Sequence, residues 1–209
     1  SLAWAGPITW DAAQDTSGPS DVLNSGSTVE AVNASTDGSG DTTINGVSFA
    51  NRSNLLGSPY GAALAGGTSG DTSFDDLVGT SNYGGGASTS IDIADGMLAP
   101  GRSYHVQVWF TDLREQFEDR AMTFGGGEGN TRDLNASNGG LGQFALGRFD
   151  ATAGSQSLPL SSNGFKNAHI SGYQVREIPE PATLMLVLLG LVGVGFANAS
   201  CRRSLAASV

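Results

Sequence analysis

The sequence predicts an all-β protein, in which a single β-sandwich, jelly-roll-like ectodomain is followed by one C-terminal transmembrane helix. Three observations lead to this prediction. Most of the chain alternates apolar and polar residues in short segments between turn-forming Gly, Asn, Asp and Ser. No long amphipathic helical pattern interrupts these segments. The one long uncharged, mostly apolar run lies near the C-terminus, at residues 182–199. Short strands without long helices form a sandwich or a jelly roll.

The ectodomain is placed at residues 6–178, which is enough chain for one domain with its own core. About nine strands are predicted there; in chain order they cover residues 7–10, 28–33, 43–49, 88–94, 103–111, 120–124, 143–150, 156–160 and 168–178. Short helical turns are expected at 73–78 and 113–119. Two low-complexity segments, 11–41 and 61–86, bury little apolar surface and are expected to be long surface loops.

The strand at 104–111 gives the clearest view of the predicted core. Side chains alternate along a strand, so one face carries Tyr104, Val106, Val108 and Phe110, which we assign to the core between two sheets. The other face carries His105, Gln107, Trp109 and Thr111. An indole beside His and Gln can stack on a sugar ring while its neighbours bind hydroxyl groups.

Two interpretations of Trp109 stay open. In the first, Trp109, His105 and Gln107 form a carbohydrate-binding platform to which Tyr83 adds a second aromatic ring. In the second, Trp109 is covered by a loop such as 61–86, or packs under another strand.

The C-terminal tail has three parts, at residues 179–209. Pro179 and Pro181 flank Glu180 and fix the start of the following helix, because a proline lacks the N–H and disfavours helical geometry before it. A membrane helix needs about 20 apolar residues and about 17 at least, so 182–199 spans a bilayer only just. Arg202 and Arg203 place the short end in the cytoplasm and the ectodomain outside. An ordinary membrane anchor and a buried core helix are the alternatives.

The order Pro179-Glu180-Pro181, a short hydrophobic helix and the pair Arg202-Arg203 resembles the PEP-CTERM tail of Gram-negative bacteria. This resemblance implies recognition by an exosortase, which processes the tail near the triplet and releases or re-attaches the protein at the cell surface. The six residues 204–209 beyond the arginines depart from the usual end of such tails.

The N-terminal end is consistent with export. Residues 1–5 include Ala3-Trp4-Ala5, the small-x-small pattern that precedes a signal-peptidase cut. We therefore expect residues 1–5 to be the end of a signal peptide, the rest of which lies upstream of Ser1, and the mature chain to start at Gly6.

Charge and cysteine content exclude several classes of protein. The net charge is −10, with only 10 Lys and Arg, so nucleic acid is not expected as a partner. The single Cys201 cannot form a disulfide within the chain; acylation at the membrane is one option for it and a passive role is the other.

The sequence offers no catalytic constellation, and we expect that the protein is not an enzyme. Its two histidines, His105 and His169, accompany neither a nucleophile motif nor zinc-ligand spacing. Paired carboxylates leave glycoside hydrolysis open; they are Asp75 and Asp76, Asp92 and Asp95, and Glu115, Glu118 and Asp119. No cofactor is expected, although a structural calcium site stays open among Asp11, Asp15, Asp21, Asp37 and Asp41.

A second resemblance concerns the ectodomain. The segment Gly101-Arg102-Ser103-Tyr104-His105-Val106-Gln107-Val108-Trp109-Phe110-Thr111-Asp112, with Arg120 and Phe124, is similar to a strand of galactose-binding-like and malectin-like jelly rolls. The segments 45–49, 142–149 and 167–176 are similar to surface domains that precede PEP-CTERM tails. The resemblance implies the fold, and no binding residue is carried over from it.

We therefore expect an exported cell-surface or extracellular-matrix protein, such as one of a biofilm matrix, with a structural ectodomain. Its expected route passes through an inner-membrane intermediate, and its expected partners are an exosortase and the membrane. The first alternative is a carbohydrate-binding module for extracellular polysaccharide, and the second is a hydrolase acting on polysaccharide.

Overall fold

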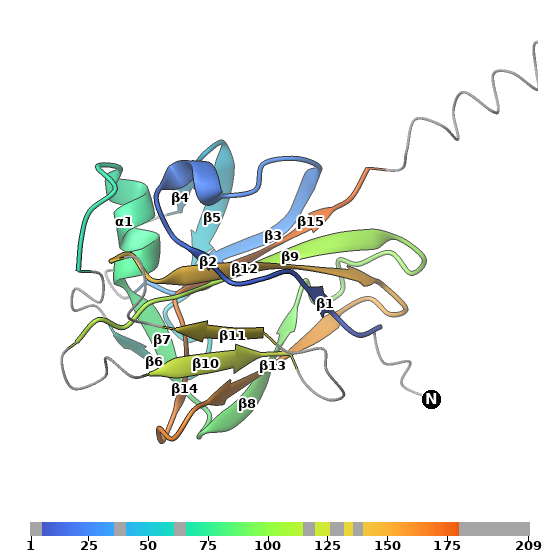
Figure 1. Cartoon of the computed structure of the whole chain (residues 1–209). Coiled ribbons are helices and arrows are strands. Elements are labelled where there is room, and N and C mark those ends of the chain that lie inside the picture. The colour runs from blue at the N-terminus through green and yellow to red at the C-terminus, as the bar shows by residue number, and fades with distance from the viewer. Residues whose placement is uncertain are drawn as a thin grey trace, which may run out of the picture. The chain divides into compact units, whose positions relative to one another are not determined.

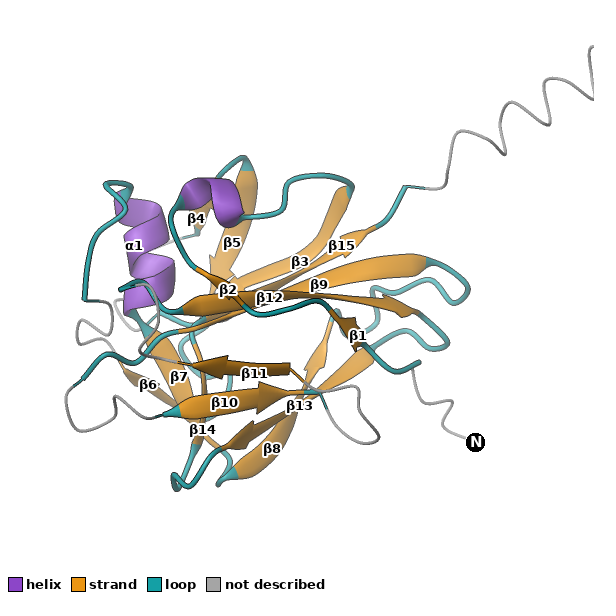
Figure 2. Ribbon diagram, viewed as in Figure 1, coloured by secondary structure: helices purple, strands orange, loops and turns teal. Residues whose placement is uncertain are grey.

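The computed structural model of the chain describes residues 6–35, 41–60, 66–114, 120–125, 132–135 and 140–179, and all structural statements below concern these residues. The chain divides into two units, Ser1–Ile178 and Pro179–Val209. All the described helices and strands lie in the first unit, which is mostly β (Figures 1 and 2). The all-β prediction for the ectodomain is confirmed.

The larger sheet has eight strands among the described residues. Its order is β1 (Thr9–Trp10), β12 (Gln143–Asp150), β9 (Ser103–Phe110), β15 (Gly172–Glu177), β3 (Ser27–Asn33), β5 (Val47–Asn51) and β4 (Thr42–Ile44), and β2 (Gln14–Asp15) also pairs with β12. The strands β3 and β5 are parallel and the other neighbours are antiparallel.

Two smaller sheets complete the described strands. A four-stranded sheet has the order β11 (Arg132–Asn135), β10 (Ala121–Phe124), β13 (Gln156–Ser162) and β8 (Ser88–Ile93). A three-stranded sheet has the order β14 (Ala168–Ile170), β7 (Ser81–Gly84) and β6 (Ser58–Tyr60). Figure 2 shows the large sheet facing these smaller ones, so that the strands form two layers.

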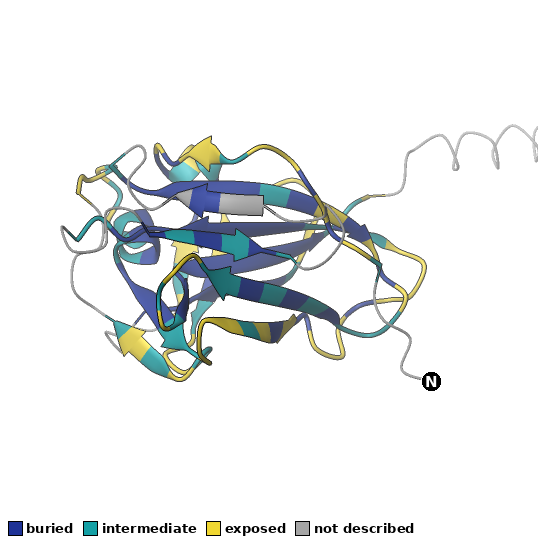
Figure 3. Ribbon diagram, turned by 60° about the horizontal axis from the view of Figure 1, so that its bottom comes forward, coloured by how far each residue is buried: buried dark blue, intermediate teal, exposed yellow. Residues whose placement is uncertain are grey.

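The main core lies between the two layers. Buried side chains of the large sheet meet buried side chains of the four-stranded sheet in one hydrophobic cluster. Tyr104, Val106, Val108 and Phe110 all belong to it, which confirms the predicted core face of β9. Figure 3 shows the result, with buried residues concentrated in the central strands and exposed residues in the loops and at the edges.

A second core lies on the opposite face of the large sheet, under the helix α1 (Thr72–Gly79). The side chain of Asp71 begins this helix by accepting a 2.9 Å hydrogen bond from the Phe74 amide. Phe74, Leu77 and Val78 follow at helical spacing and are buried with Trp109. The predicted helical turn at 73–78 is therefore confirmed.

The expectation that 61–86 is a surface loop is wrong for its described residues. The segment holds α1 and β7, and six of its described residues are buried: Phe74, Leu77, Val78, Thr80, Ser81 and Asn82. The low-complexity composition hid a short amphipathic helix, because its few apolar residues all fall on one face.

Two predicted strands are each divided in the structure. The segment 43–49 is a hairpin of β4 and β5, turned by Asn45 and Gly46 with φ angles of 48° and 78°. Positive φ at both positions is the geometry of the tight two-residue hairpin turn that Asn-Gly favours. The segment 168–178 changes sheets at Ser171, so that β14 and β15 belong to different layers.

The remaining differences concern short elements. The strands β2, β6, β7 and β11 were not expected, and the predicted strand 7–10 is reduced to β1. Residues 115–119 of the expected helical turn at 113–119 lie outside the described residues.

Within the part of the chain that the structure describes, no helix is long and apolar enough to cross a membrane. The predicted transmembrane segment 182–199 lies outside that part.

We predict that Leu77→Ala lowers the free energy of unfolding by about 2–5 kcal/mol, because it empties a site that is fully buried between α1 and the large sheet. Gly172 brings the strand β15 so close that its missing side chain would lie 2.5 Å from Leu77 Cδ1. Urea denaturation measures the effect.

The matched control is Met97→Ala, which shortens a side chain that is 51% exposed and should change the stability by less than about 0.5 kcal/mol. Equal effects of the two substitutions would contradict the packing of α1 on Trp109.

Candidate functional site

A buried carboxylate lies just beyond the end of β9. Asp112 is fully buried, and Arg114 donates two hydrogen bonds to it, from Nε at 2.7 Å and Nη2 at 2.8 Å. Arg120 donates a third from Nη1 at 2.9 Å. Burial acts to raise the pKa of Asp112, but the hydrogen bonds from the two arginines outweigh it and the pKa is lowered. Asp112 is therefore an ionised anchor for two guanidinium groups.

His169 lies beside this ion-pair cluster, in the middle of β14. Its ring is 1% exposed, and Arg120 Nη1 lies 3.1 Å from its Nδ1. Burial lowers the pKa of His169 to about 3, and the positive charge of Arg120 acts in the same direction. His169 is therefore neutral near pH 7. Because a guanidinium can only donate, Nδ1 is the acceptor and the proton of the neutral ring sits on Nε2.

The Nε2–H of His169 is a buried donor, and it has no hydrogen-bond partner among the described residues. The edge of the ring is held in place by Phe110, whose ring is perpendicular to it at a centroid distance of 5.3 Å. Buried donors are rarely left without an acceptor. His169 is also one of the residues that line a cavity.

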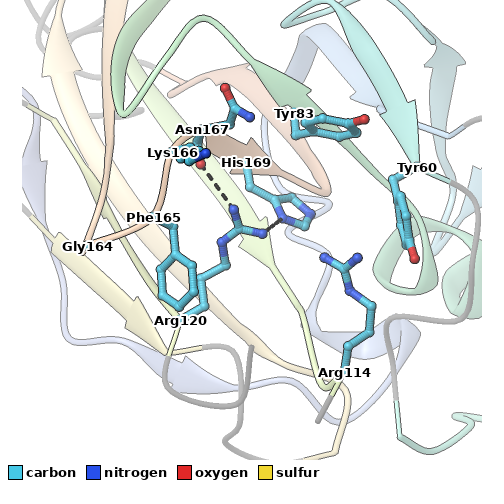
Figure 4. A pocket seen from close by; sticks show the side chains of 9 residues that line it. All are labelled: Tyr60, Tyr83, Arg114, Arg120, Gly164, Phe165, Lys166, Asn167 and His169. Carbon is cyan, nitrogen blue, oxygen red and sulfur yellow. Dashed lines mark hydrogen bonds between the residues drawn. The ribbon is translucent and has the colours of Figure 1, made fainter. Parts of the chain in front are cut away.

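The cavity has a volume of about 440 Å³, within the range of small-molecule sites. We call it the cationic cavity, and its lining is drawn in Figure 4: the aromatic Tyr60, Tyr83 and Phe165, the basic Arg114, Arg120 and Lys166, and His169, Asn167 and Gly164. Three of the ten Lys and Arg of the chain line it, including the only lysine, and these lining residues include no Asp or Glu.

The aromatic rings fix the orientation of the cations. The guanidinium carbon of Arg114 lies 4.2 Å from the centre of the Tyr60 ring, and that of Arg120 lies 5.0 Å from the centre of the Phe165 ring. Tyr60 and Tyr83 meet edge to face, with ring centroids 6.4 Å apart. Arg120 also donates to the Asn167 carbonyl at 3.2 Å. The two arginines are therefore held by contacts on several sides.

The predicted carbohydrate platform is not assembled. Trp109 is fully buried, with its ring perpendicular to that of Phe49 at 5.9 Å, in the core under α1. Gln107 is buried as well, and it bonds to Leu23, Asp21 and Gln174. Of the two interpretations, the covered Trp109 is the one that the structure supports, because α1 closes this face of the sheet.

The other two platform residues lie in different places. His105 lines an open groove with Asp11 and Arg148, near the described N-terminal end of the chain. Tyr83 lines the cationic cavity. The structure therefore brings only Tyr83 into a site, and its neighbours there are not the ones that the sequence suggested.

The remaining sequence candidates are dispersed. Of the sorting residues, Pro179 is exposed, and the others lie outside the described residues: Glu180, Pro181, Arg202 and Arg203. Asp37, one of the calcium candidates, also lies outside them. The same holds for three of the candidate catalytic carboxylates, Glu115, Glu118 and Asp119. Asp15 accepts a hydrogen bond from Gln143, and Asp21 accepts from Ser17 and Gly18. In the described part of the chain, no three His, Cys, Asp or Glu side chains gather as metal ligands would.

The carboxylates of the adjacent pair have local roles. Asp75 accepts hydrogen bonds from the Ser69 amide at 2.7 Å and its hydroxyl at 2.6 Å. Asp76 accepts from Asn33 at 2.7 Å. Both therefore join α1 to neighbouring segments. Asp92 and Asp95 are exposed.

Sequence reasoning missed the cationic cavity. Two signals were present: Asp112 and Arg114 follow directly on the best-defined strand, and Lys166 is the only lysine in an acidic chain. Neither signal shows that the ends of β9, β6 and β14 meet.

Comparison with known proteins indicates the class of protein by a match in the C-terminal tail. A β-sandwich domain followed by a sorting tail defines an exported protein with a membrane-associated sorting signal. Residues 177–203 match the PEP-CTERM protein-sorting motif, so this chain carries that motif and the resemblance of its tail is confirmed. The comparison with curated proteins found no match.

Solved structures give distant similarities. A calcium-binding mutant of Bacteroides uniformis β-glucuronidase 2 aligns with a TM-score of 0.49 and 12% identity, over 72% of this chain and 18% of that one. The plant receptor-like kinase FER aligns with a TM-score of 0.46 and 14% identity, over 73% and 50%. This chain thus spans no more than half of either protein. Since both TM-scores are below 0.5, nothing is carried over from them, and the resemblance to galactose-binding-like jelly rolls stays a prediction.

We predict that His169→Asn weakens the pH dependence of stability on the acid side. The unfolded chain takes up a proton near the ordinary histidine pKa of 6.5, whereas folded His169 takes it up only at about 3. Stability is therefore complete above pH 6.5 and is lost as the pH falls toward 3, by about 1.4 kcal/mol per pH unit. Urea denaturation at pH 7, 5.5 and 4 measures the loss.

The control is His105→Asn, which removes the other histidine of the chain. The ring of His105 is more accessible than that of His169, and its substitution should leave most of the acid-side loss in place. If the free energy of unfolding falls with pH at the same rate in the His169→Asn variant and in the unchanged protein, the conclusion that His169 is buried and neutral is wrong.

Proposed function

We propose that the chain is an exported cell-surface or extracellular-matrix protein, delivered by exosortase processing of its PEP-CTERM tail. Its jelly-roll-like ectodomain acts as a structural component and not as an enzyme. The match of residues 177–203 to the sorting motif carries this proposal, because it includes the Pro-Glu-Pro triplet and both terminal arginines. An inner-membrane intermediate anchored by 182–199 precedes release or re-attachment at the surface.

The place where the fold ends supports processing at the triplet. The Ile178 amide donates a 2.9 Å hydrogen bond to the Ser103 carbonyl, next to the last residues of β15. Pro179, the next residue, is exposed. A cut near the triplet would therefore remove none of the described strands, and the ectodomain would keep both of its cores.

The local roles of the polar residues support a structural ectodomain. Asp112 is ion-paired to two arginines, Asp75 and Asp76 fasten α1, and His169 is neutral and buried. A general acid or base works best with a pKa near the operating pH, and the lowered pKa values of Asp112 and His169 are far from it. Polysaccharide hydrolysis stays the weaker alternative.

Carbohydrate binding is the second candidate function. The face of Trp109 no longer supports it, but the cationic cavity does, since Tyr60, Tyr83 and Phe165 line a space of ligand size together with hydrogen-bonding groups. Extracellular polysaccharide is the expected partner in that case.

We predict that replacing Pro179-Glu180-Pro181 by three alanines abolishes processing. The triplet is the part of the tail at which exosortase recognition is expected, and removing it also removes the fixed start of the helix. Intact-mass analysis of protein from the envelope and the medium of an exosortase-carrying host should show a chain shortened near Pro179 for the unchanged protein, and a full-length chain in the membrane for the variant.

The control is deletion of residues 204–209, which leaves the triplet, the helix and Arg202-Arg203 intact and should be processed normally. A full-length, membrane-confined chain for the unchanged protein would overturn the proposal in favour of a plain anchor.

A further inference from the structure

We propose that the folded ectodomain controls the access of the exosortase to the sorting motif, because Glu177 and Ile178 must leave the large sheet before the chain is processed. This inference rests on the proposed function, since it concerns the regulation of that processing. Three observations carry it: the motif overlaps the end of β15, this end is paired on both sides, and a buried arginine limits how far it can open.

The sorting motif and the folded sheet share residues. The motif match covers residues 177–203, and Glu177 is also the last residue of β15. Ile178 follows, and its amide donates a 2.9 Å hydrogen bond to the Ser103 carbonyl. The next residue is Pro179, which is exposed and begins the Pro-Glu-Pro triplet. No unpaired spacer therefore separates the sheet from the triplet.

Pairing in the sheet and binding to an enzyme exclude each other at these residues. Proteins that bind an extended peptide do so largely through hydrogen bonds to its main chain. Each residue has one amide donor, and Ile178 already uses its donor on Ser103. For a cut near the triplet, Glu177 and Ile178 lie among the residues that the exosortase contacts. They must therefore be released from the sheet first.

The end of β15 is not a loose sheet edge. Glu177 pairs with Tyr104 of β9 on one side and with Ser27 of β3 on the other. Its carboxylate also lies 3.7 Å from Arg102 Nη1. Release of Glu177 therefore breaks contacts on both sides of the strand. The free energy of this local opening lowers the fraction of chains that are ready for processing.

Arg176 sets the limit of the opening. Its side chain is buried, and its guanidinium donates hydrogen bonds to the backbone carbonyls of residues 24–26 and to the Thr28 hydroxyl. Withdrawal of Arg176 would break all of these bonds at once, whereas Glu177 and Ile178 are only half-buried. The opening is therefore confined to Glu177 and Ile178, and both cores stay intact while the tail is processed.

The first test supplies the missing spacer. Insertion of Gly-Ser-Gly-Ser between Ile178 and Pro179 gives the exosortase unpaired residues before the triplet, so that the sheet no longer has to open. We expect processing about tenfold faster than in the unchanged protein, which is the effect of removing the need to break one or two backbone hydrogen bonds. A time course of intact masses in an exosortase-carrying host measures the rate.

The control appends the same four residues after Val209. It lengthens the chain equally without separating the sheet from the triplet, and its processing rate should equal that of the unchanged protein.

The second test weakens the end of the strand without a spacer. Arg102 lies outside residues 177–203, so Arg102→Glu leaves the motif unchanged while it replaces attraction to Glu177 by repulsion. Processing should become about threefold faster, in keeping with the modest strength of an exposed ion pair. In the spacer variant the same substitution should have no further effect, because the two changes act on one opening step.

Lys166→Glu is the matched control for Arg102→Glu. It makes the same change of charge on the exposed loop before β14, away from β15, and it should leave the processing rate unchanged.

Hydrogen exchange tests the opening in the absence of the exosortase. In the full-length chain in detergent, the Ile178 amide should exchange more slowly than an unpaired amide, because it bonds to Ser103. Arg102→Glu should speed this exchange about threefold, by the same factor as the processing.

The outcomes separate this inference from the proposed function. Absence of processing in both the unchanged protein and the spacer variant overturns the proposed sorting, and the control by the sheet with it. Equal rates in these two proteins overturn the control by the sheet alone. The same holds for equal effects of Arg102→Glu and Lys166→Glu, and for an Ile178 amide that exchanges as fast as an unpaired one.

Discussion

The burial of the strand β9 on both faces is the constraint on which the rest of the domain depends. β9 pairs with β12 along its whole length, from Ser103 to Phe110, and with β15 on its other side. One face packs in the main core and the other carries Trp109 into the core under α1. Because Gln107 is also on the buried second face, its amide needs internal partners, and Leu23, Asp21 and Gln174 provide them. The central strand thus fixes the first loop, the helix and the second layer.

The ion-pair cluster follows from where β9 ends. Asp112 leaves the strand still buried, and an unpaired carboxylate there would be costly. The ion pairs with Arg114 and Arg120 offset that cost. Buried ion pairs of this kind contribute little net stability compared with apolar packing. Their clearer consequence is geometric: the guanidinium groups are held at one end of the domain, beside β6 and β14, where Tyr60, Tyr83 and His169 face them. The cavity is therefore a product of the same burial that stabilises the sheet.

The sequence predicted correctly the features that depend on residues close together in the chain. The alternation of Tyr104, Val106, Val108 and Phe110 gave their common face correctly, and the order of the tail residues gave the sorting motif. The sheet change at Ser171 was not visible, because both halves of 168–178 favour strands and only their distant partners differ. Trp109 could not be placed by alternation alone, since whether the second face of β9 is exposed depends on α1. The cationic cavity needs residues of the three-stranded sheet together with residues of loops that follow β9, precede β10 and precede β14, a juxtaposition that no single segment encodes.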